Sequence, residues 1–86
     1  MNKSYFHDNS NMISESLRRL RKEKRMSQEE LAAQLQLMGV DINQRLISKI
    51  ERNERFVKDY ELACLCRVLD VTERELLADF YERLKD

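Results

Sequence analysis

The sequence predicts a single all-α domain, and both composition and spacing support this. The chain has 86 residues, no proline and one glycine, so few positions favour the tight turns of β-hairpins. Leucine, arginine, glutamate, alanine and glutamine are abundant, and all are good helix formers. Apolar residues recur mainly at the spacing of a helix face rather than in the alternation of a strand. Five helices and no strand are therefore expected.

The first helix is expected at residues 13–23, where Ser10 or Ser14 is placed to cap its start. Its apolar side is formed at helical spacing by Ile13, Leu17 and Leu20. The preceding residues, 1–12, are polar and have no sustained periodicity. We therefore expect a flexible N-terminal tail, followed by one domain that spans residues 13–86.

The second helix is expected to open with a capping box. The Ser27 hydroxyl can accept from the Glu30 amide while the Glu30 carboxylate reaches back to the Ser27 amide. Met26 and Leu31 are placed as a hydrophobic staple around this turn, and Gly39 is a suitable left-handed stop. The apolar face of this helix is formed by Leu31, Ala32 and Leu35.

The third helix is expected from Asn43 to Asn53. Asparagine is a good N-cap, and at the other end it tolerates the left-handed conformation that stops a helix. The buried face is predicted to carry Leu46, Ile47 and Ile50. The other side is polar and basic, with Gln44, Arg45, Ser48, Lys49 and Arg52.

Two further helices complete the prediction. The fourth is expected to begin at an Asp59 N-cap, and a second capping box from Thr72 to Glu75 opens the fifth. Apolar residues of the fourth helix are Leu62, Leu65, Cys66 and Leu69. Those of the fifth are Leu76, Leu77, Phe80 and Leu84.

Charge is unevenly distributed although the formal net charge is zero. Residues 14–25 hold six basic and two acidic side chains, and residues 43–58 hold five basic and two acidic ones. Residues 59–86 hold four basic and eight acidic side chains. A basic region with an acidic back suits a protein that binds a polyanion in one orientation, and ordinary solvated helix faces are the alternative.

Several functional classes lack the residues they need. Cys64 and Cys66 lie on different faces of a helix and cannot pair easily, so reduced thiols and a cytoplasmic location are expected. With His7 as the single histidine, neither a metal site nor a cofactor is expected. There is no nucleophile partnered by histidine and no glycine-rich phosphate loop, which argues against an enzyme. No apolar run is long enough to span a membrane.

Four segments together resemble the phage-repressor and Cro type of helix-turn-helix domain, also called the xenobiotic-response-element family. They are Leu17-Arg18-Arg19-Leu20-Arg21, Ser27-Gln28-Glu29-Glu30-Leu31-Ala32, Ile47-Ser48-Lys49-Ile50-Glu51-Arg52-Asn53, and Leu69-Asp70-Val71-Thr72 followed by Glu75-Leu76-Leu77. The resemblance covers residues 17–77 and rests on their order and spacing. It implies a compact five-helix repressor-like bundle, sequence-specific binding of double-stranded DNA, and transcription regulation.

The resemblance implies that the third helix reads bases in the major groove with Gln44, Arg45, Ser48 and Lys49. The residue types agree, because glutamine suits adenine and arginine or lysine suits guanine. DNA-backbone contacts are expected from Ser27, Gln28, Asn43, Arg52, Arg55 and Lys58. Solvated loop charges are an alternative for Arg55 and Lys58. The tail is a further candidate arm, although Lys3 is its single cation.

The resemblance also implies an ion pair between Arg21 and Glu51 that braces the third helix. The chain departs from the family pattern in the connection at residues 36–43, which is about five residues longer than usual. Asn53 and Asp70 stand where glycine is common, and Val57 stands where proline is frequent. The longer connection puts in doubt the usual angle between the second and third helices.

Aromatic and aliphatic side chains on the fifth helix predict an interface. Phe80, Tyr81 and Leu84 either cover the bottom of the bundle or form a two-fold homodimer, which we favour because two-fold dimers are the commonest oligomers. The rival to DNA binding is a protein-interaction module, such as an antitoxin or an anti-repressor partner. The polar and basic outer side of the third helix favours DNA, because protein interfaces are richer in aromatic groups.

Overall fold

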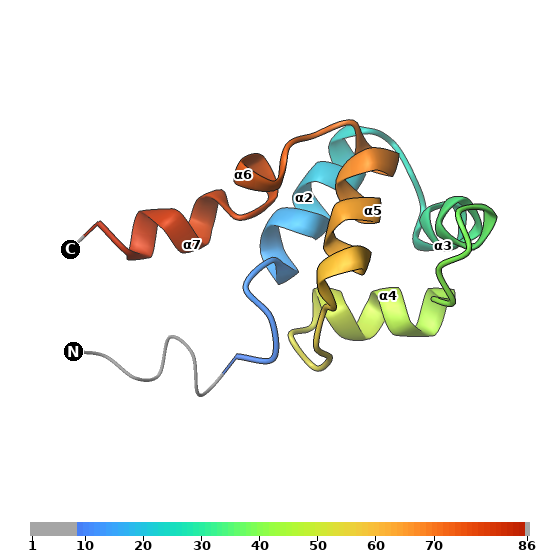
Figure 1. Cartoon of the computed structure of the whole chain (residues 1–86), viewed down its shortest axis with the longest axis horizontal. Helices are drawn as coiled ribbons and strands as arrows, with labels where there is room; N and C mark the ends of the chain where they lie inside the picture. The colour runs from blue at the N-terminus through green and yellow to red at the C-terminus, as the bar shows by residue number, and fades with distance from the viewer. Residues whose placement is uncertain (1–8, 86) are drawn as a thin grey trace.

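The computed structural model describes residues 9–85, and over this range it contains six helices and no strand (Figure 1). They are α2 (Ser14–Glu23), α3 (Gln28–Leu37), α4 (Gln44–Glu51), α5 (Asp59–Leu69), α6 (Glu73–Leu76) and α7 (Ala78–Arg83). The predicted all-α fold is confirmed. None of these helices has the length and apolar content that crossing a bilayer requires.

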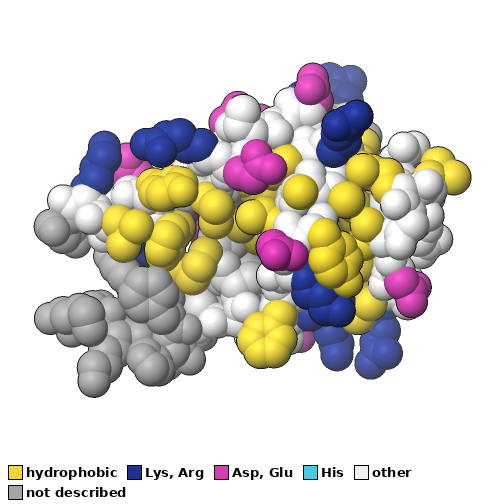
Figure 2. Space-filling model, viewed as in Figure 1, with side chains coloured by type: hydrophobic (Ala, Val, Ile, Leu, Met, Phe, Trp, Pro, Cys, Tyr) yellow, Lys and Arg dark blue, Asp and Glu magenta, His cyan; other side chains and the backbone are white. Residues whose placement is uncertain are grey.

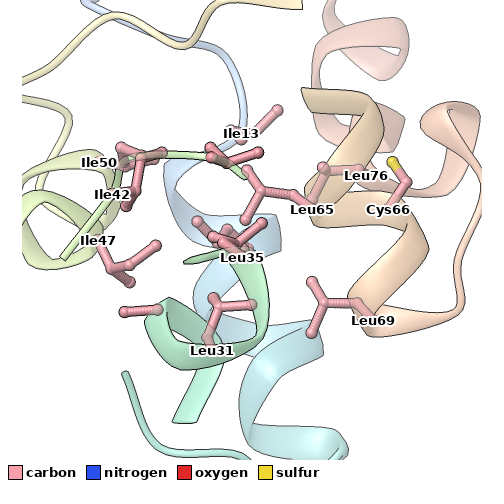
Figure 3. Close-up of a cluster of buried hydrophobic side chains, with 13 residues drawn as sticks. Ile13, Leu31, Leu35, Ile42, Ile47, Ile50, Leu65, Cys66, Leu69 and Leu76 are labelled. Atoms are coloured by element: carbon pink, nitrogen blue, oxygen red, sulfur yellow. The ribbon is translucent and has the colours of Figure 1, made fainter. Parts of the chain in front are cut away.

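One apolar core joins all the helices except α7 (Figure 3). Leu35 of α3 belongs to this cluster, and nine large apolar side chains have no more than trace exposure. These are Leu17, Leu31, Leu35, Ile42, Ile47, Ile50, Leu65, Leu69 and Leu76. Burial of each contributes about 1.5–3 kcal/mol to folding. By contrast α7 buries no residue and extends from the bundle along the 41 Å long axis of the molecule (Figure 1).

Local chemistry places most helix ends where the sequence predicts them. Both capping boxes are formed, with hydroxyl-to-amide distances of 3.0 Å at Ser27 and at Thr72. The Asn43 side chain accepts from the Leu46 amide at 3.0 Å and caps α4. Asn53 and Asp70 adopt the left-handed conformation, with φ of 62° and 57°, as expected for helix stops without glycine.

Two predicted caps are wrong. Neither Ser10 nor Ser14 caps α2, because Ile13 occupies the N-cap position and its amide donates to the Asn11 side chain at 2.9 Å. Asp59 is the first residue of α5 rather than its N-cap. The chain enters the helix one residue earlier because the Glu61 carboxylate accepts from the Lys58 amide at 3.0 Å.

The long connection between α3 and α4 is anchored to the bundle. Gly39 turns the chain with φ of 86°, and the Val40 amide then bonds to the Leu35 carbonyl at 3.0 Å. Val40 and Ile42 are buried in the core, and the Gln36 side chain donates to the Ile42 carbonyl at 2.9 Å. Val40 and Ile42 therefore anchor the connection in the core, whereas Leu37, Met38 and Asp41 are exposed.

The predicted fifth helix is interrupted. Leu77 separates α6 from α7 with ψ of 11°, although the amides of Leu77 and Tyr81 keep helical hydrogen bonds. On one side of this break Leu76 is fully buried, and on the other Asp79 contacts α2 through Ser16 at 3.1 Å and Arg19 at 3.7 Å. The apolar period continues across the break, so sequence alone predicts one helix.

The predicted N-terminal tail lies partly outside the described residues. Within the described part, residues 9–11 are hydrogen-bonded to Asn53 and to the backbone carbonyls of Ile50 and Arg55. Sequence periodicity misses this attachment because it depends on polar side chains that bind residues about 40 positions away in the chain.

The different environments of Cys64 and Cys66 predict a difference in thiol reactivity. Burial, with added repulsion from Glu73 and Glu75, raises the pKa of Cys66 to about 11, whereas Cys64 is half-buried. At pH 8 the Cys66 thiolate is then about one part in a thousand. We expect iodoacetamide to modify one cysteine in the native protein and both in denaturant, as measured by mass spectrometry. The Cys64→Ser variant should be almost unreactive until unfolded. Equal native rates at both thiols would contradict this.

Candidate nucleic-acid interface

The helix α4 presents a polar side to solvent at the edge of the bundle (Figure 1). Its inner side is fixed by Ile47 and Ile50, which have no exposed surface. Gln44 and Arg45, in the first turn, are exposed, and Ser48 and Lys49 are half-buried one turn later. All four predicted base-reading residues thus lie on α4, and the two at its N-terminal end are exposed.

A buried ion pair joins α4 to α2. The Arg21 guanidinium donates to both carboxylate oxygens of Glu51, with Nε–Oε2 of 2.7 Å and Nη2–Oε1 of 3.0 Å. The two side chains are only 10% and 4% exposed. Arg21 also donates to the Met26 carbonyl at 2.8 Å, so one guanidinium connects α2, the turn before α3, and α4.

Hydrogen bonds extend from this ion pair to the N-terminal end of α4. Gln28 donates through Nε2 to Glu51 Oε1 at 2.9 Å and accepts through Oε1 from Gln44 at 2.7 Å. The first residue of α3 therefore orients the first residue of α4. Gln44 uses one amide hydrogen in this contact and keeps a donor and a carbonyl oxygen, which are the two groups that the adenine edge requires.

A second polar group lies one turn further along α4. The Arg52 guanidinium donates to the Ser48 hydroxyl and pairs with the Glu54 carboxylate at 3.2 Å. Both charged side chains are about half exposed. Because the pair is solvated, its contribution to stability is small, and Arg52 can exchange Glu54 for another anion at little cost.

Cations surround a shallow hollow between α2, α3 and α4. Arg18 and Lys22 are exposed one helical turn apart on α2, and they line this hollow with Gln28, Ser48 and Arg52. Sequence reasoning did not select Arg18 or Lys22 as site residues. The signal available was the excess of basic residues at positions 14–25, together with the i, i+4 spacing of these two.

The remaining predicted backbone contacts lie in different environments. Ser27 and Asn43 are exposed, and their side-chain oxygens cap α3 and α4. Lys58 is exposed, with its ammonium 5.7 Å from the centre of the Tyr60 ring.

Arg55, which the sequence predicts as a phosphate contact or a solvated loop charge, forms an ion pair with a buried carboxylate. Its guanidinium donates to both carboxylate oxygens of Glu61, at 2.9 and 3.2 Å, and the side chains are 20% and 3% exposed. Burial opposes ionisation of Glu61, but hydrogen bonds from Arg55 and the Lys58 amide outweigh it and lower the Glu61 pKa. Arg55 therefore neutralises a buried carboxylate.

Of the predicted interface residues, Phe80 and Tyr81 lie on α7 and Leu84 is its C-cap. Apolar side chains gather over α6 and α7 (Figure 2). Phe80 is half-buried, whereas Tyr81 and Leu84 are 38% and 51% exposed. The Arg74 guanidinium lies 4.8 Å from the centre of the Tyr81 ring. The bundle alone thus leaves part of this apolar surface uncovered.

Comparison with known protein families gives one result. The sequence model of a family described as a helix-turn-helix domain matches residues 13–80. The match begins at the first core residue, Ile13, and extends from α2 into α7. Among curated proteins, none matches the chain in sequence.

The Arg55–Glu61 pair predicts a stability change in acid. Because the Glu61 pKa is lower in the folded chain than its ordinary 4.5, the pair stabilises fully above that value, and the stabilisation is lost as pH falls through the folded pKa. Glu61→Gln should lower the free energy of unfolding at pH 7 by about 1–3 kcal/mol. The substitution should also reduce the additional loss of stability between pH 5 and pH 3, as measured by urea unfolding.

The matched control is Glu54→Gln, which removes a solvated pair and should change little. If Glu61→Gln and wild type show the same loss of stability on acidification, Glu61 does not have the lowered pKa.

Proposed function

The chain belongs to the helix-turn-helix domain family, and we propose that it is a repressor-like transcription regulator that binds specific sequences of double-stranded DNA. In this proposal α4 is the recognition helix and enters the major groove with its N-terminal turns. A helix in that position reads base edges, because its first side chains point toward them.

The observation that carries the proposal is the division of α4 into two sides. Ile47 and Ile50 are fully buried, and this leaves Gln44 and Arg45 exposed on the outer side. Gln44 suits the N6 and N7 edge of adenine, and Arg45 suits O6 and N7 of guanine. Ser48 and Lys49 follow one turn later as further base-reading candidates.

Phosphate contacts are assigned around α4. The amides at the start of α3, with Ser27 and Gln28, suit one phosphate because a helix N-terminus favours anions. Asn43, Arg52 and Lys58 are the other predicted contacts. The exposure of Arg18 and Lys22 beside the same hollow supports adding them, whereas the buried Glu61 partner argues against Arg55.

The alternative is a helix-turn-helix module that binds another protein. Such a surface is expected to present aromatic and aliphatic groups. The exposed residues in the first turn of α4 are a glutamine and an arginine, so the outer side of α4 favours DNA. Exposed apolar groups lie on α7 instead, where they support a second activity, association of two chains.

We assign that association to a two-fold homodimer through Phe80, Tyr81 and Leu84. One recognition helix contacts only a few base pairs, so two are needed for a usefully specific site. A dimer of this kind binds a near-palindrome whose half-sites are about 34 Å apart.

The test of base reading is Arg45→Ala, on a duplex selected by the wild-type protein from a random pool. Loss of a bidentate contact to guanine should weaken specific binding by about 1–3 kcal/mol and leave binding to unrelated duplex less affected. The matched control is Arg67→Ala, an equal change of charge on the last turn of α5, away from α4 (Figure 1). Equal effects of the two substitutions would reject α4 as the reading helix.

Salt dependence tests the DNA proposal as a whole. Six phosphate contacts should give a slope near −5 for the logarithm of the binding constant against the logarithm of salt concentration. A flat dependence would point to the protein-partner alternative.

The test of dimerisation is Leu84→Asp. A carboxylate in an apolar interface should dissociate the dimer and weaken operator binding, while the stability of the monomer changes little because Leu84 is half exposed. Sedimentation equilibrium measures the mass. The control is Leu37→Asp, because Leu37 is 81% exposed at the end of α3. A wild-type chain that stays monomeric at micromolar concentration and on its operator would contradict the dimer.

A further inference from the structure

Three asparagines connect the segment before α2 to the C-terminal end of α4. We call the contacts of Asn9, Asn11 and Asn53 the asparagine latch. The Asn53 side chain accepts through Oδ1 from the amides of Ser10 and Asn11, at 2.8 and 3.1 Å. Its Nδ2 donates to Asn9 Oδ1 at 2.5 Å. One side chain thus binds three consecutive residues of a segment more than 40 positions away.

Asn11 completes the latch from the other side. Its Nδ2 donates to the carbonyls of Ile50 and Arg55, both at 3.0 Å. Ile50 lies in the last turn of α4, and its carbonyl also accepts from the Asn53 amide at 3.0 Å. Through Oδ1 the same side chain accepts from the Ile13 amide at 2.9 Å. Asn11 therefore fixes the end of α4, the loop after it, and the start of α2 to one another.

The backbone at Asn53 indicates that its side chain has a use beyond stopping the helix. With φ of 62° this residue is left-handed, a conformation that glycine adopts without steric cost. Asp70 ends α5 with nearly the same φ of 57°, and no hydrogen bond from its side chain to the described residues is seen. The two positions thus have equivalent backbones, but only Asn53 is bound to a distant segment.

The latch acts on the helix that the proposed function assigns to base reading. The other polar contacts that hold α4 join Arg21 with Glu51 and Gln28 with Gln44. They lie on the side of α4 that faces α2 and α3. The latch adds a further restraint at the C-terminal end of α4, against the segment before α2. A reading helix must be held to about 0.5 Å for its side chains to meet base edges, because misplaced hydrogen bonds lose their discrimination.

From these contacts we propose that Asn11 and Asn53 are positioning residues for α4, and that the asparagine latch sets the direction of the recognition helix and so its sequence discrimination. The inference rests on the proposed function, because discrimination requires DNA binding. It adds the segment before α2 to the DNA-binding unit, although no residue of the latch needs to touch DNA.

The experiment compares Asn53→Gly with Asp70→Gly. Both remove a side chain at a left-handed position, so helix stopping alone predicts that both variants are as stable as wild type or more so. The latch predicts that only Asn53→Gly weakens the protein. Hydrogen exchange of the amides at residues 50–55 should be about three- to tenfold faster in Asn53→Gly and unchanged in Asp70→Gly, as expected from the loss of hydrogen bonds.

The second readout is the ratio of affinities for the selected duplex and for an unrelated duplex. It is measured at a temperature where every variant is fully folded, so that lost stability alone does not change it. Asn53→Gly should lower this ratio by about three- to tenfold, and Asp70→Gly should leave it unchanged.

A second variant keeps the proposal testable if Asn53→Gly folds poorly. Asn11→Asp retains the acceptor for the Ile13 amide but removes both donors to the carbonyls of Ile50 and Arg55, and it should lower the same ratio. Ser10→Ala is its control, because Ser10 contributes its backbone amide to the latch.

Three results would overturn the proposal. In the first, Asn53→Gly has the same hydrogen-exchange rates and the same ratio of duplex affinities as Asp70→Gly. This would show that the asparagine latch does not restrain α4. The second is faster exchange with an unchanged duplex ratio, which would make the latch purely structural. A wild-type chain that prefers no duplex sequence would overturn the proposed function and the positioning role together, and the exchange data would still report on the latch itself.

Discussion

The bidentate ion pair between Arg21 and Glu51 is the constraint on which the placement of α4 depends. Two charged side chains are buried together, and neither tolerates the loss of the other because an unpaired buried charge costs several kcal/mol. The net gain in stability from such a pair is small, so its main effect is geometric. It sets α4 against α2, and through Gln28 it also sets the first side chain of α4.

Apolar burial and polar contacts have different roles around α4. Ile47 and Ile50 supply the driving force that docks the helix, but hydrophobic contact is not directional and tolerates small rotations. Hydrogen bonds depend steeply on distance and angle, so they define the orientation that burial leaves open. The described polar contacts lie at both ends of α4: Gln44 at its start, and Glu51 and the asparagine latch at its end.

Charge counted along the sequence overstates the cations available for a polyanion. Arg21 and Arg55 lie in the two basic segments, yet each is bound to a buried glutamate. Arg18, Lys22 and Arg45 are exposed, and these carry the positive surface near α4. The distinction is invisible in a sum of charges, because it depends on which carboxylate the fold brings within reach of each arginine.

The sequence by itself determined the features that depend on neighbouring residues. Capping boxes, left-handed stops at Asn53 and Asp70, and the buried side of α4 follow from local hydrogen bonding and helical spacing, and they predict the fold class. The candidate reading residues came from the resemblance to helix-turn-helix domains, with which their residue types agree. Only the tertiary structure decided the rest: the ion pair between Arg55 and Glu61, the break at Leu77, and the attachment of residues 9–11 to α4. None of these follows from helical spacing, because the residue types involved fit several partners and only the packed chain selects among them.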